Sequence, residues 1–228
     1  MKHKTNNLGE PKKTPAVAVD TLIFSVIDNK LKILLIKILG GAYKNKWAIP
    51  GGLVDTNESL EKAASRILSQ KAGVDGIYLE QLATFGDPKR DSRGHSVSVA
   101  YFALVNDKLF YPKTTEYYAD IAWKNVDTLP TMAFDHKKII EYGKERLMSK
   151  LAYSNIAYAL LPKEFTLTEL QSVYEAVLGK VLDKRNFRKK VQEIKLVKET
   201  TRTRQLGANR PAKLFIFTQR HPRIMDIL

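Results

Sequence analysis

WAIPGGLVDTNESLEKAASRILSQKAGV, residues 47–74, is the stretch that decides the fold of this chain. Pro50-Gly51-Gly52 predicts a turn, because glycine adopts backbone angles that other residues avoid. Asp55 and Glu58 are spaced as a pair that caps the free amides of a helix start. An apolar helix face follows, and Gly73 is placed to end that helix. The residues of this face recur at helical spacing: Leu60, Ala64, Ile67 and Leu68.

The same stretch resembles the Nudix box, G-x5-E-x7-R-E-U-x-E-E-x-G-U, in which U is a bulky aliphatic residue. The matching residues are Gly52, Glu58, Arg66, Leu68, Gly73 and Val74. The three helix glutamates that hold the catalytic metal in that family are replaced here by Ile67, Gln70 and Lys71. The resemblance therefore implies a Nudix fold without Nudix hydrolysis.

The missing glutamates bear directly on metal chemistry. Hydrolysis of a diphosphate uses a metal ion to neutralise charge, and carboxylates hold Mg²⁺. Asp55, Glu58 and Glu61 remain nearby, and we interpret them as helix-start charges that complement the helix dipole. We therefore predict no catalytic residues, no metal site and no required cofactor. Lys71 leads to a further hypothesis, that its ammonium replaces the metal and binds a diphosphate; a solvated lysine is the alternative.

Composition sets the class of protein. The chain has 228 residues, 44% of them hydrophobic, and no cysteine, which excludes disulfides and thiolate metal sites. Residues 1–15 are polar, show no signal-peptide core and are expected to form a flexible tail. Residues 16–27 are apolar but contain Asp20 and are too few to span a bilayer. We expect a cytoplasmic protein.

Positive charge is concentrated at the C-terminal end. The formal net charge is +14, and residues 149–228 hold 16 Lys and Arg against 7 Asp and Glu. Such an excess favours a polyanionic partner, because lysine and arginine neutralise phosphates and release counterions. A basic surface that only aids solubility is the alternative.

The pattern of residues 16–148 predicts an α/β sandwich, and the resemblance to the Nudix family implies an α/β/α sandwich with a mixed sheet. Strands are expected at 17–27 and 32–37, joined by a hairpin turn at 28–30, and at 78–85, 96–105 and 121–126. Helical periodicity marks the box helix and residues 135–148. Strands that alternate with helices in this order are typical of a layered α/β domain, here the Nudix-like ligand-sensing domain.

Residues 149–228 predict a second domain of the winged helix-turn-helix type. A helix at 151–161 precedes a capping box of Thr166 and Glu169, and Gly179 ends the helix that the box begins. Asp183 is placed to cap a helix at 184–195. Strands at 196–198 and 213–217 then enclose a long basic loop.

The helix from Lys184 has the layout of a recognition helix. Phe187, Val191 and Ile194 share one face, and cationic and amide side chains occupy the other, where they can reach phosphates and base edges. The loop adds arginines that suit contacts with the DNA backbone. A solvated cationic helix is the alternative. The candidate DNA-binding residues are Lys184, Arg185, Asn186, Arg188, Lys189, Gln192, Arg202, Arg204 and Arg210.

The segment LPKEFTLTELQSVYEAVLGKVLDKRNFRKKV, residues 161–191, resembles the C-terminal domain of Nudix-related transcriptional regulators, the NrtR-like family. The resemblance covers nearly the whole chain, from about residue 17 to 217. It implies a homodimer whose winged helix binds operator DNA and whose Nudix domain senses ADP-ribose or a related nucleotide. A pentose such as arabinose is the main alternative effector.

Candidate effector-binding residues come from two strands, the box helix and the loop FGDPKRDSRGH at residues 85–95, which in this family borders the ligand pocket. Arginine suits bidentate recognition of phosphate or carboxylate. A salt-bridged surface loop is the alternative for its charges, and core packing is the alternative for the aromatic rings of Trp47, Phe85 and Tyr101. The candidates are Lys37, Lys71, Phe85, Arg90, Arg93 and His95.

Two other functions are compatible with these patterns. One is an ADP-ribose or nucleoside-diphosphate pyrophosphatase with an appended basic domain, which would need Mg²⁺-dependent release of AMP. The other is an RNA-binding or scaffold protein, whose binding would be salt-sensitive and indifferent to DNA sequence.

Overall fold

The computed structural model describes residues 14–72, 77–109, 118–205 and 211–227, with the side chains of Lys71, Ala72 and Leu109 excepted. The predicted tail, residues 1–15, therefore lies almost wholly outside the described residues. The N-terminal strands are β1 (Ala16–Ile27), β2 (Lys30–Ile38), β3 (Trp47–Ala48), β4 (Gly51–Leu53), β5 (Tyr78–Phe85), β6 (Ser96–Leu104) and β7 (Tyr118–Asn125).

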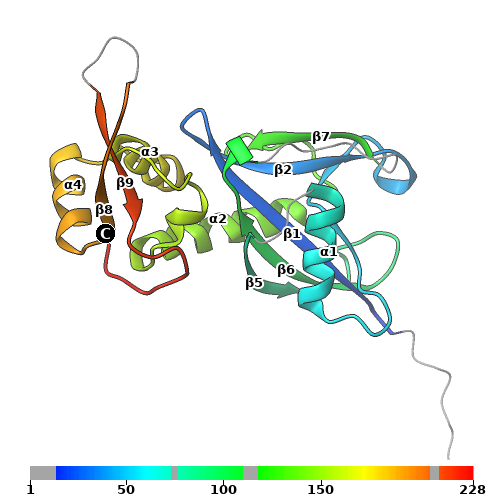
Figure 1. Cartoon of the computed structure of the whole chain (residues 1–228). Coiled ribbons are helices and arrows are strands. Elements are labelled where there is room, and N and C mark those ends of the chain that lie inside the picture. The colour runs from blue at the N-terminus through cyan, green and yellow to red at the C-terminus, as the bar shows by residue number, and fades with distance from the viewer. Residues whose placement is uncertain (1–13, 73–76, 110–117, 206–210, 228) are drawn as a thin grey trace, which may run out of the picture.

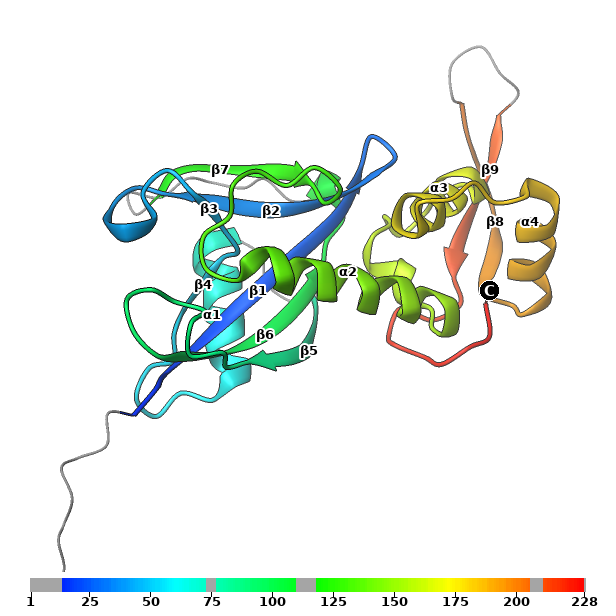
Figure 2. The same ribbon diagram turned by 180° about the vertical axis from the view of Figure 1, so that it is seen from behind.

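These strands form one mixed sheet, in the order β3-β2-β1-β6-β5, with β4 paired to β1 and β7 to β2. β1 and β6 run parallel and the other pairs are antiparallel. Helix α1 (Leu60–Ala72) covers one face and α2 (His136–Tyr153) the other, as Figures 1 and 2 show from opposite sides. The predicted α/β/α sandwich with a mixed sheet is confirmed.

The hairpin between β1 and β2 is tighter than predicted. Ile27 pairs with Lys30, so the turn holds only Asp28 and Asn29, both with positive φ, of 52° and 56°. Aspartate and asparagine tolerate this left-handed backbone better than most residues, which makes a two-residue turn possible here.

The box helix begins later than the capping prediction placed it. The hydroxyl of Ser59 accepts the Lys62 amide hydrogen at 3.3 Å, and α1 starts at Leu60. Glu58 does accept the backbone amide of Asp55 at 3.1 Å, which is one half of the expected capping pair. The Asp55 carboxylate instead lies 3.4 Å from Arg66, so the predicted side-chain cap at Asp55 is wrong.

Helix α2 is one continuous helix where the sequence predicted two. It runs to Tyr153 through the expected boundary between residues 148 and 149, because Met148-Ser149-Lys150 contains no helix breaker. Near its middle, Gly143 lies against β1: a Cβ there would be 2.5 Å from Leu22 Cδ2. A short 3-10 turn, η3 (Ile156–Ala159), follows. Shorter 3-10 turns, η1 (Gly41–Tyr43) and η2 (Asp107–Leu109), lie in the N-terminal part.

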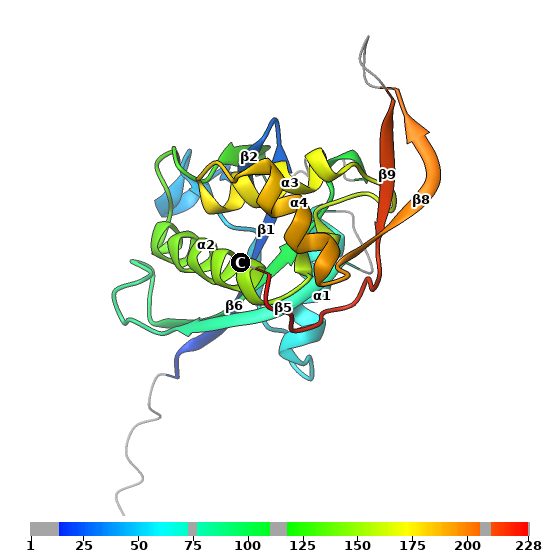
Figure 3. The ribbon, with the colours of Figure 1, turned by 90° about the vertical axis from the view of Figure 1, so that its left-hand side faces the viewer.

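The C-terminal part contains α3 (Leu167–Leu178), α4 (Lys184–Glu193), β8 (Val197–Arg204) and β9 (Ala212–Phe217). The capping box of Thr166 and Glu169 is present in both halves, Gly179 ends α3 with φ of 67°, and Asp183 caps α4. Figure 3 shows α4 beside the β8–β9 hairpin, which projects from the body as a wing. Helices α3 and α4 together with the β8–β9 wing confirm the predicted winged helix.

One hydrophobic core connects the two parts. Leu22 and Phe24 of the sheet belong to the same buried cluster as Leu147 and Leu151 of α2 and Tyr174 of α3. Among the described residues, no helix combines the length and the apolar character that crossing a membrane requires.

Candidate functional site

A cavity of about 590 Å³ opens in the N-terminal part, where β1 and β4 separate from β2 and β3. Loop 86–95 and the segment leading into α2 complete its walls. Its apolar lining includes Ile36, Ile38, Ile49, Leu53, Tyr118 and Phe134, and its polar lining includes Asp20, Arg90, Asp91, Arg93, His95, Ser96 and His136.

Arg90 is the centre of a buried polar cluster in this cavity wall. Its side chain is only 3% exposed, and its Nη2 lies 3.2 Å from Asp20 Oδ2 and 2.9 Å from Asp135 Oδ1. Nε also donates to Asp135 Oδ2 at 3.3 Å, and Nη1 donates to Ser96 Oγ at 3.0 Å. One guanidinium is thus shared by two carboxylates that come from β1 and from the residue preceding α2.

Asp20 is charged although it is buried. Burial alone would raise the pKa of its carboxyl group, but His136, the Ser98 hydroxyl and Arg90 outweigh that cost and hold the pKa at about 2. Ser98 Oγ donates to Asp20 Oδ2 at 2.6 Å. His136 Nδ1 accepts the Ile49 amide hydrogen at 2.9 Å, so the ring proton belongs on Nε2, which faces Asp20 at 3.5 Å.

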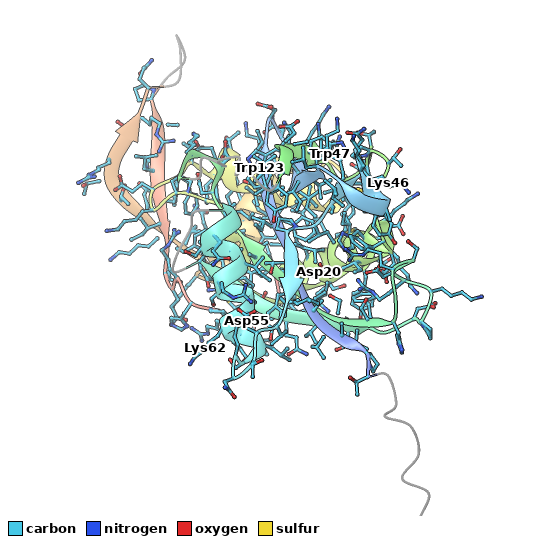
Figure 4. The ribbon with its side chains drawn as sticks, turned by 90° about the vertical axis from the view of Figure 1, so that its right-hand side faces the viewer. Asp20, Lys46, Trp47, Asp55, Lys62 and Trp123 are labelled. Carbon is cyan, nitrogen blue, oxygen red and sulfur yellow. The ribbon has the colours of Figure 1, made fainter. Side chains whose placement is uncertain are left out.

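Gly51 completes this cluster from β4. A Cβ built on Gly51 would overlap Asp20 Oδ1, so only glycine fits beside the buried carboxylate. Figure 4 shows Asp20 within the body of the molecule, whereas Lys46 reaches its edge and Asp55 and Lys62 mark the start of α1.

Phe134 lines one side of the cavity, and the Tyr43 ring packs against it. Tyr43 and Phe134 have ring centroids 4.2 Å apart, and the guanidinium carbon of Arg93 lies 5.0 Å from the Phe134 centroid. Phe134 has φ of 52°, a strained backbone for an aromatic residue, and such strain is concentrated at functional sites. Arg93 also forms an ion pair of 2.8 Å with Asp91.

The structure brings together three of the six predicted effector-binding residues: Arg90, Arg93 and His95 line the cavity. Lys37 does not, because strand alternation places it on the face opposite to Ile36 and Ile38, which do. Phe85 packs edge-on against Tyr142 of α2, at 5.9 Å between ring centroids. The Lys71 side chain lies outside the described residues.

Sequence reasoning missed Asp20, Ser98, Asp135 and His136. Asp20 carried a signal, because it is a lone acid within an otherwise apolar strand. His136 and Asp135 carried none, since only the fold brings the start of α2 against β1. The predicted stacking residues Trp47 and Tyr101 differ in burial: Tyr101 is 2% exposed and Trp47 is half-buried.

The box residues do not fit a metal ion. Ile67 is fully buried in an apolar cluster with Val19 and Val99. Gln70 is exposed and uncharged. Glu58 accepts two hydrogen bonds of 2.7 Å from Arg66, which lowers the pKa of its carboxyl group to about 2. Among the described residues, no group of three or more His, Asp and Glu side chains could hold a metal.

The outer face of α4 is an open surface formed by side chains of this helix and of its capping residue Asp183. It contains most of the predicted recognition residues and two acids at its ends. Phe187 and Val191 are buried on the opposite face of the helix, as the spacing predicted. The residues of this surface are Asp183, Lys184, Arg185, Arg188, Lys189, Gln192 and Glu193.

Several predicted DNA-binding side chains also make internal contacts. Arg188 donates to Thr168 Oγ1 at 3.0 Å. Arg202 and Arg204 lie on β8 rather than in the loop, because β8 is longer than predicted. Arg204 binds Glu169 at 2.8 Å, and Arg202 binds Glu164 at 3.1 Å.

The two predicted DNA-binding residues not yet placed are Asn186 and Arg210, and Lys189 of the outer face of α4 also makes an internal contact. Lys189 pairs with Glu193 one helical turn later, at 3.7 Å. Asn186 is exposed near the start of α4, where its backbone amide donates to Asp183. Arg210 falls outside the described residues.

Comparison with known proteins agrees with both parts. Residues 16–143 match the family model of the NUDIX domain, and residues 157–217 match the NrtR DNA-binding winged helix domain. An ADPR responsive transcriptional repressor, NtrR, of Acinetobacter baylyi is 40% identical over 208 residues, which is 90% of this chain and 82% of the relative.

Solved structures show the same architecture. Shewanella oneidensis NrtR complexed with a 27mer DNA superimposes with a TM-score of 0.77 and 36% identity, covering 89% of this chain and 93% of the other. The NUDIX domain of that protein complexed with ADP ribose matches with a TM-score of 0.53 and 36% identity, over 61% of this chain and 94% of the other. The chain therefore belongs to the NrtR family, in which a Nudix domain precedes a winged helix domain.

Proposed function

We propose that this protein is a transcriptional regulator that binds operator DNA and responds to ADP-ribose. The observation that carries the proposal is the combination, in one chain, of a ligand cavity and a cationic winged helix, aligned along 90% of its length with an ADPR responsive repressor. Residues 16–148 sense the effector and residues 149–228 bind DNA, with α2 shared between the two.

The chemistry of the cavity supports a nucleotide effector. Arg93 is 61% exposed on its side chain and offers a guanidinium to a phosphate. The Tyr43 and Phe134 rings provide an aromatic surface beside it. A free pentose offers neither a phosphate for Arg93 nor a base for the rings, so ADP-ribose or a related nucleotide is the effector that we favour over a sugar.

The exposed face of α4 supports DNA binding. Lys184, Arg185 and Gln192 are exposed there, and the β8–β9 wing stands beside the helix. Cationic side chains bind phosphates, and amide side chains can read base edges in the major groove. We propose that a homodimer places two such helices on a palindromic operator.

We propose further that the protein does not hydrolyse its effector. The positions that would hold Mg²⁺ carry a buried isoleucine and an exposed glutamine, and Glu58 is engaged by Arg66. Incubation of ADP-ribose with the protein and Mg²⁺ should release no AMP. Release of AMP that disappears in the Glu58→Gln variant would instead establish a pyrophosphatase.

The direct test is fluorescence anisotropy of labelled promoter fragments from neighbouring operons. We expect one fragment to bind far more tightly than a scrambled duplex of the same length, and saturating ADP-ribose to weaken that binding. Arg185→Ala should weaken operator binding, whereas Lys138→Ala, an exposed site on α2, should not. Equal binding to operator and scrambled DNA would contradict the proposal.

A further inference from the structure

Helix α2 connects the ligand cavity with the winged helix. At its start, Asp135 and His136 belong to the buried cluster around Arg90. At its end, the Ala152 and Tyr153 carbonyls accept the backbone amide hydrogens of Ile227 and Met225, at 2.9 and 2.8 Å. An α-helix of 18 residues is about 27 Å long. A rigid element therefore reaches from the effector site to the DNA-binding part.

The attachment at the start of α2 depends on one shared cation. Asp20 has three partners, Ser98, His136 and Arg90, whereas the only ion pair that the described structure gives the Asp135 carboxylate is with Arg90. Asp135 precedes the helix but its side chain does not cap it. One cation facing two carboxylates leaves an excess negative charge, and Asp135, unlike Asp20, keeps no other ion-pair partner among the described residues when Arg90 is drawn away.

We propose that an anionic group of the effector competes with Asp135 for Arg90 and thereby releases the start of α2. This step rests on the proposed function, and it concerns the regulation of the same cavity. Arg90 lines the cavity and can meet a phosphate without leaving its buried position. Once Arg90 turns to the phosphate, Asp135 loses its counter-ion and the first turn of α2 is no longer bound to β1.

The contact at Gly143 explains how this release reaches the winged helix. Gly143 is the eighth of the 18 residues of α2 and lies directly on Leu22 and Phe24 of β1. Because the helix rests on the sheet at its middle, a shift of its start tilts its end in the opposite direction. The C-terminal segment follows, since Asn155 also accepts the Arg223 amide hydrogen at 2.7 Å and donates to the His221 carbonyl at 3.0 Å.

The test separates effector binding from its transmission. In Asp135→Asn the carboxamide keeps the shape of the side chain but no longer competes for Arg90. We expect this variant to bind ADP-ribose at least as tightly as the unmodified protein in calorimetry. In the unmodified protein, ADP-ribose should weaken operator binding by about fivefold or more, the usual lower bound of allosteric coupling. In Asp135→Asn this factor should fall to less than about twofold.

The matched control is Asp127→Asn. Asp127 is exposed and pairs with Lys144 on the outer side of α2, at 2.6 Å, away from the cavity. In the Asp127→Asn variant, ADP-ribose should weaken operator binding by the same factor as in the unmodified protein. A coupling factor in Asp135→Asn equal to that of the unmodified protein would overturn the proposed competition while leaving the regulator function intact. Loss of any ADP-ribose response in the unmodified protein would overturn both.

Distance measurement provides a second readout that does not depend on DNA binding. The chain has no cysteine, so cysteines introduced at the exposed residues Lys62 and Lys163 can be spin-labelled selectively. Lys62 reports on α1 and Lys163 on the winged helix. Saturating ADP-ribose should shift the distance distribution between them in the otherwise unmodified protein, and should not shift it when Asp135→Asn is added. An unchanged distribution in the former would also overturn the proposal.

Discussion

The guanidinium of Arg66 binds both carboxylate oxygens of Glu58, with two nitrogen–oxygen distances of 2.7 Å. Nη2 of the same arginine also donates to the Leu53 carbonyl at 3.1 Å, which joins β4 to α1. Arg66 and Glu58, two of the residues that match the Nudix box, therefore fix the conformation of the loop between β4 and α1. The box can keep its shape after the metal-binding residues have changed.

Arg66→Lys should weaken this loop although it keeps the positive charge, because lysine cannot form the two-pronged contact. The hydrogen bonds from Arg66 are the main cause of the lowered pKa of Glu58, about 2 against an ordinary 4.5. We expect that pKa to rise and the melting temperature to fall. A carboxyl titration followed by NMR measures the first, and calorimetry the second. Lys62→Arg, at an exposed site of α1, is the control and should change neither.

Arg90→Met should destabilise the protein strongly. It leaves Asp20 and Asp135 without their cation, and removing one partner of a buried ion pair costs about 3–5 kcal/mol. Urea unfolding followed by circular dichroism measures this loss. Arg93→Ala offers the contrast, because its side chain is exposed: stability should change by less than about 1 kcal/mol while ADP-ribose affinity falls. Equal losses of stability in both variants would refute the assignment of Arg90 to a structural ion pair and of Arg93 to effector binding.

Asp20 should make the stability of the protein depend on acid pH. Its pKa is about 2 in the folded state against 3.8 for an ordinary aspartate, so it binds protons more readily when unfolded. Its contribution of about 2 kcal/mol is thus fully present above pH 5 and is lost as the pH falls towards 2. Unfolding free energies of the unmodified protein and Asp20→Asn, measured from pH 7 to 3, should converge with falling pH. Parallel curves would contradict this reasoning.

Gly143→Ala should destabilise the protein even though alanine favours helices. The added methyl group meets Leu22 at 2.5 Å, and overpacking of this kind costs about 1–3 kcal/mol. Leu22→Ala in the same chain removes that obstacle. The double variant should therefore be more stable than the sum of the two single losses predicts, which a double-mutant cycle of urea unfolding will measure.

Removing cations from the outer face of α4 should reduce operator affinity and its salt dependence together. A variant that removes one cation facing a phosphate, such as Lys184→Ala or Arg185→Ala, should lower the slope of log affinity against log salt by about 1. Arg204→Ala should act differently, because it breaks the ion pair with Glu169 and lowers the stability of the winged helix. Anisotropy titrations between 50 and 200 mM salt, roughly the range over which such binding weakens steeply, separate the two effects.

Predictions from the sequence were most accurate where the residues that determine a helix start or end lie within about one helical turn of each other. The Thr166–Glu169 capping box, the Asp183 cap and the left-handed Gly179 each depend on neighbours that are at most four residues away. The order of strands and helices predicted the layered α/β domain and the winged helix, and the family resemblance implied the mixed sheet. The helix start at Ser59 was missed because Asp55 and Glu58 present the same capping signal four residues earlier.

The cavity was less predictable, because distant segments build it. His136 lies 116 positions after Asp20, and nothing near either residue indicates the other. Arg204 and Glu169 are likewise 35 positions apart in the sequence. Their contact means that Arg204, a predicted DNA-binding residue, also pairs with a carboxylate of the protein itself. Charge and spacing identify which residues can bind a phosphate. Only the fold shows which of them already have a partner.

The contact between Gly51 and Asp20 also limits how this protein can evolve. Any side chain at position 51 would overlap the buried carboxylate, and a smaller residue at position 20 would leave Arg90 with one counter-ion fewer. Neither position can change freely while the other stays as it is. In diverging descendants of this gene, substitutions at the two positions should arise together, and each pair should be accompanied by a change at position 90.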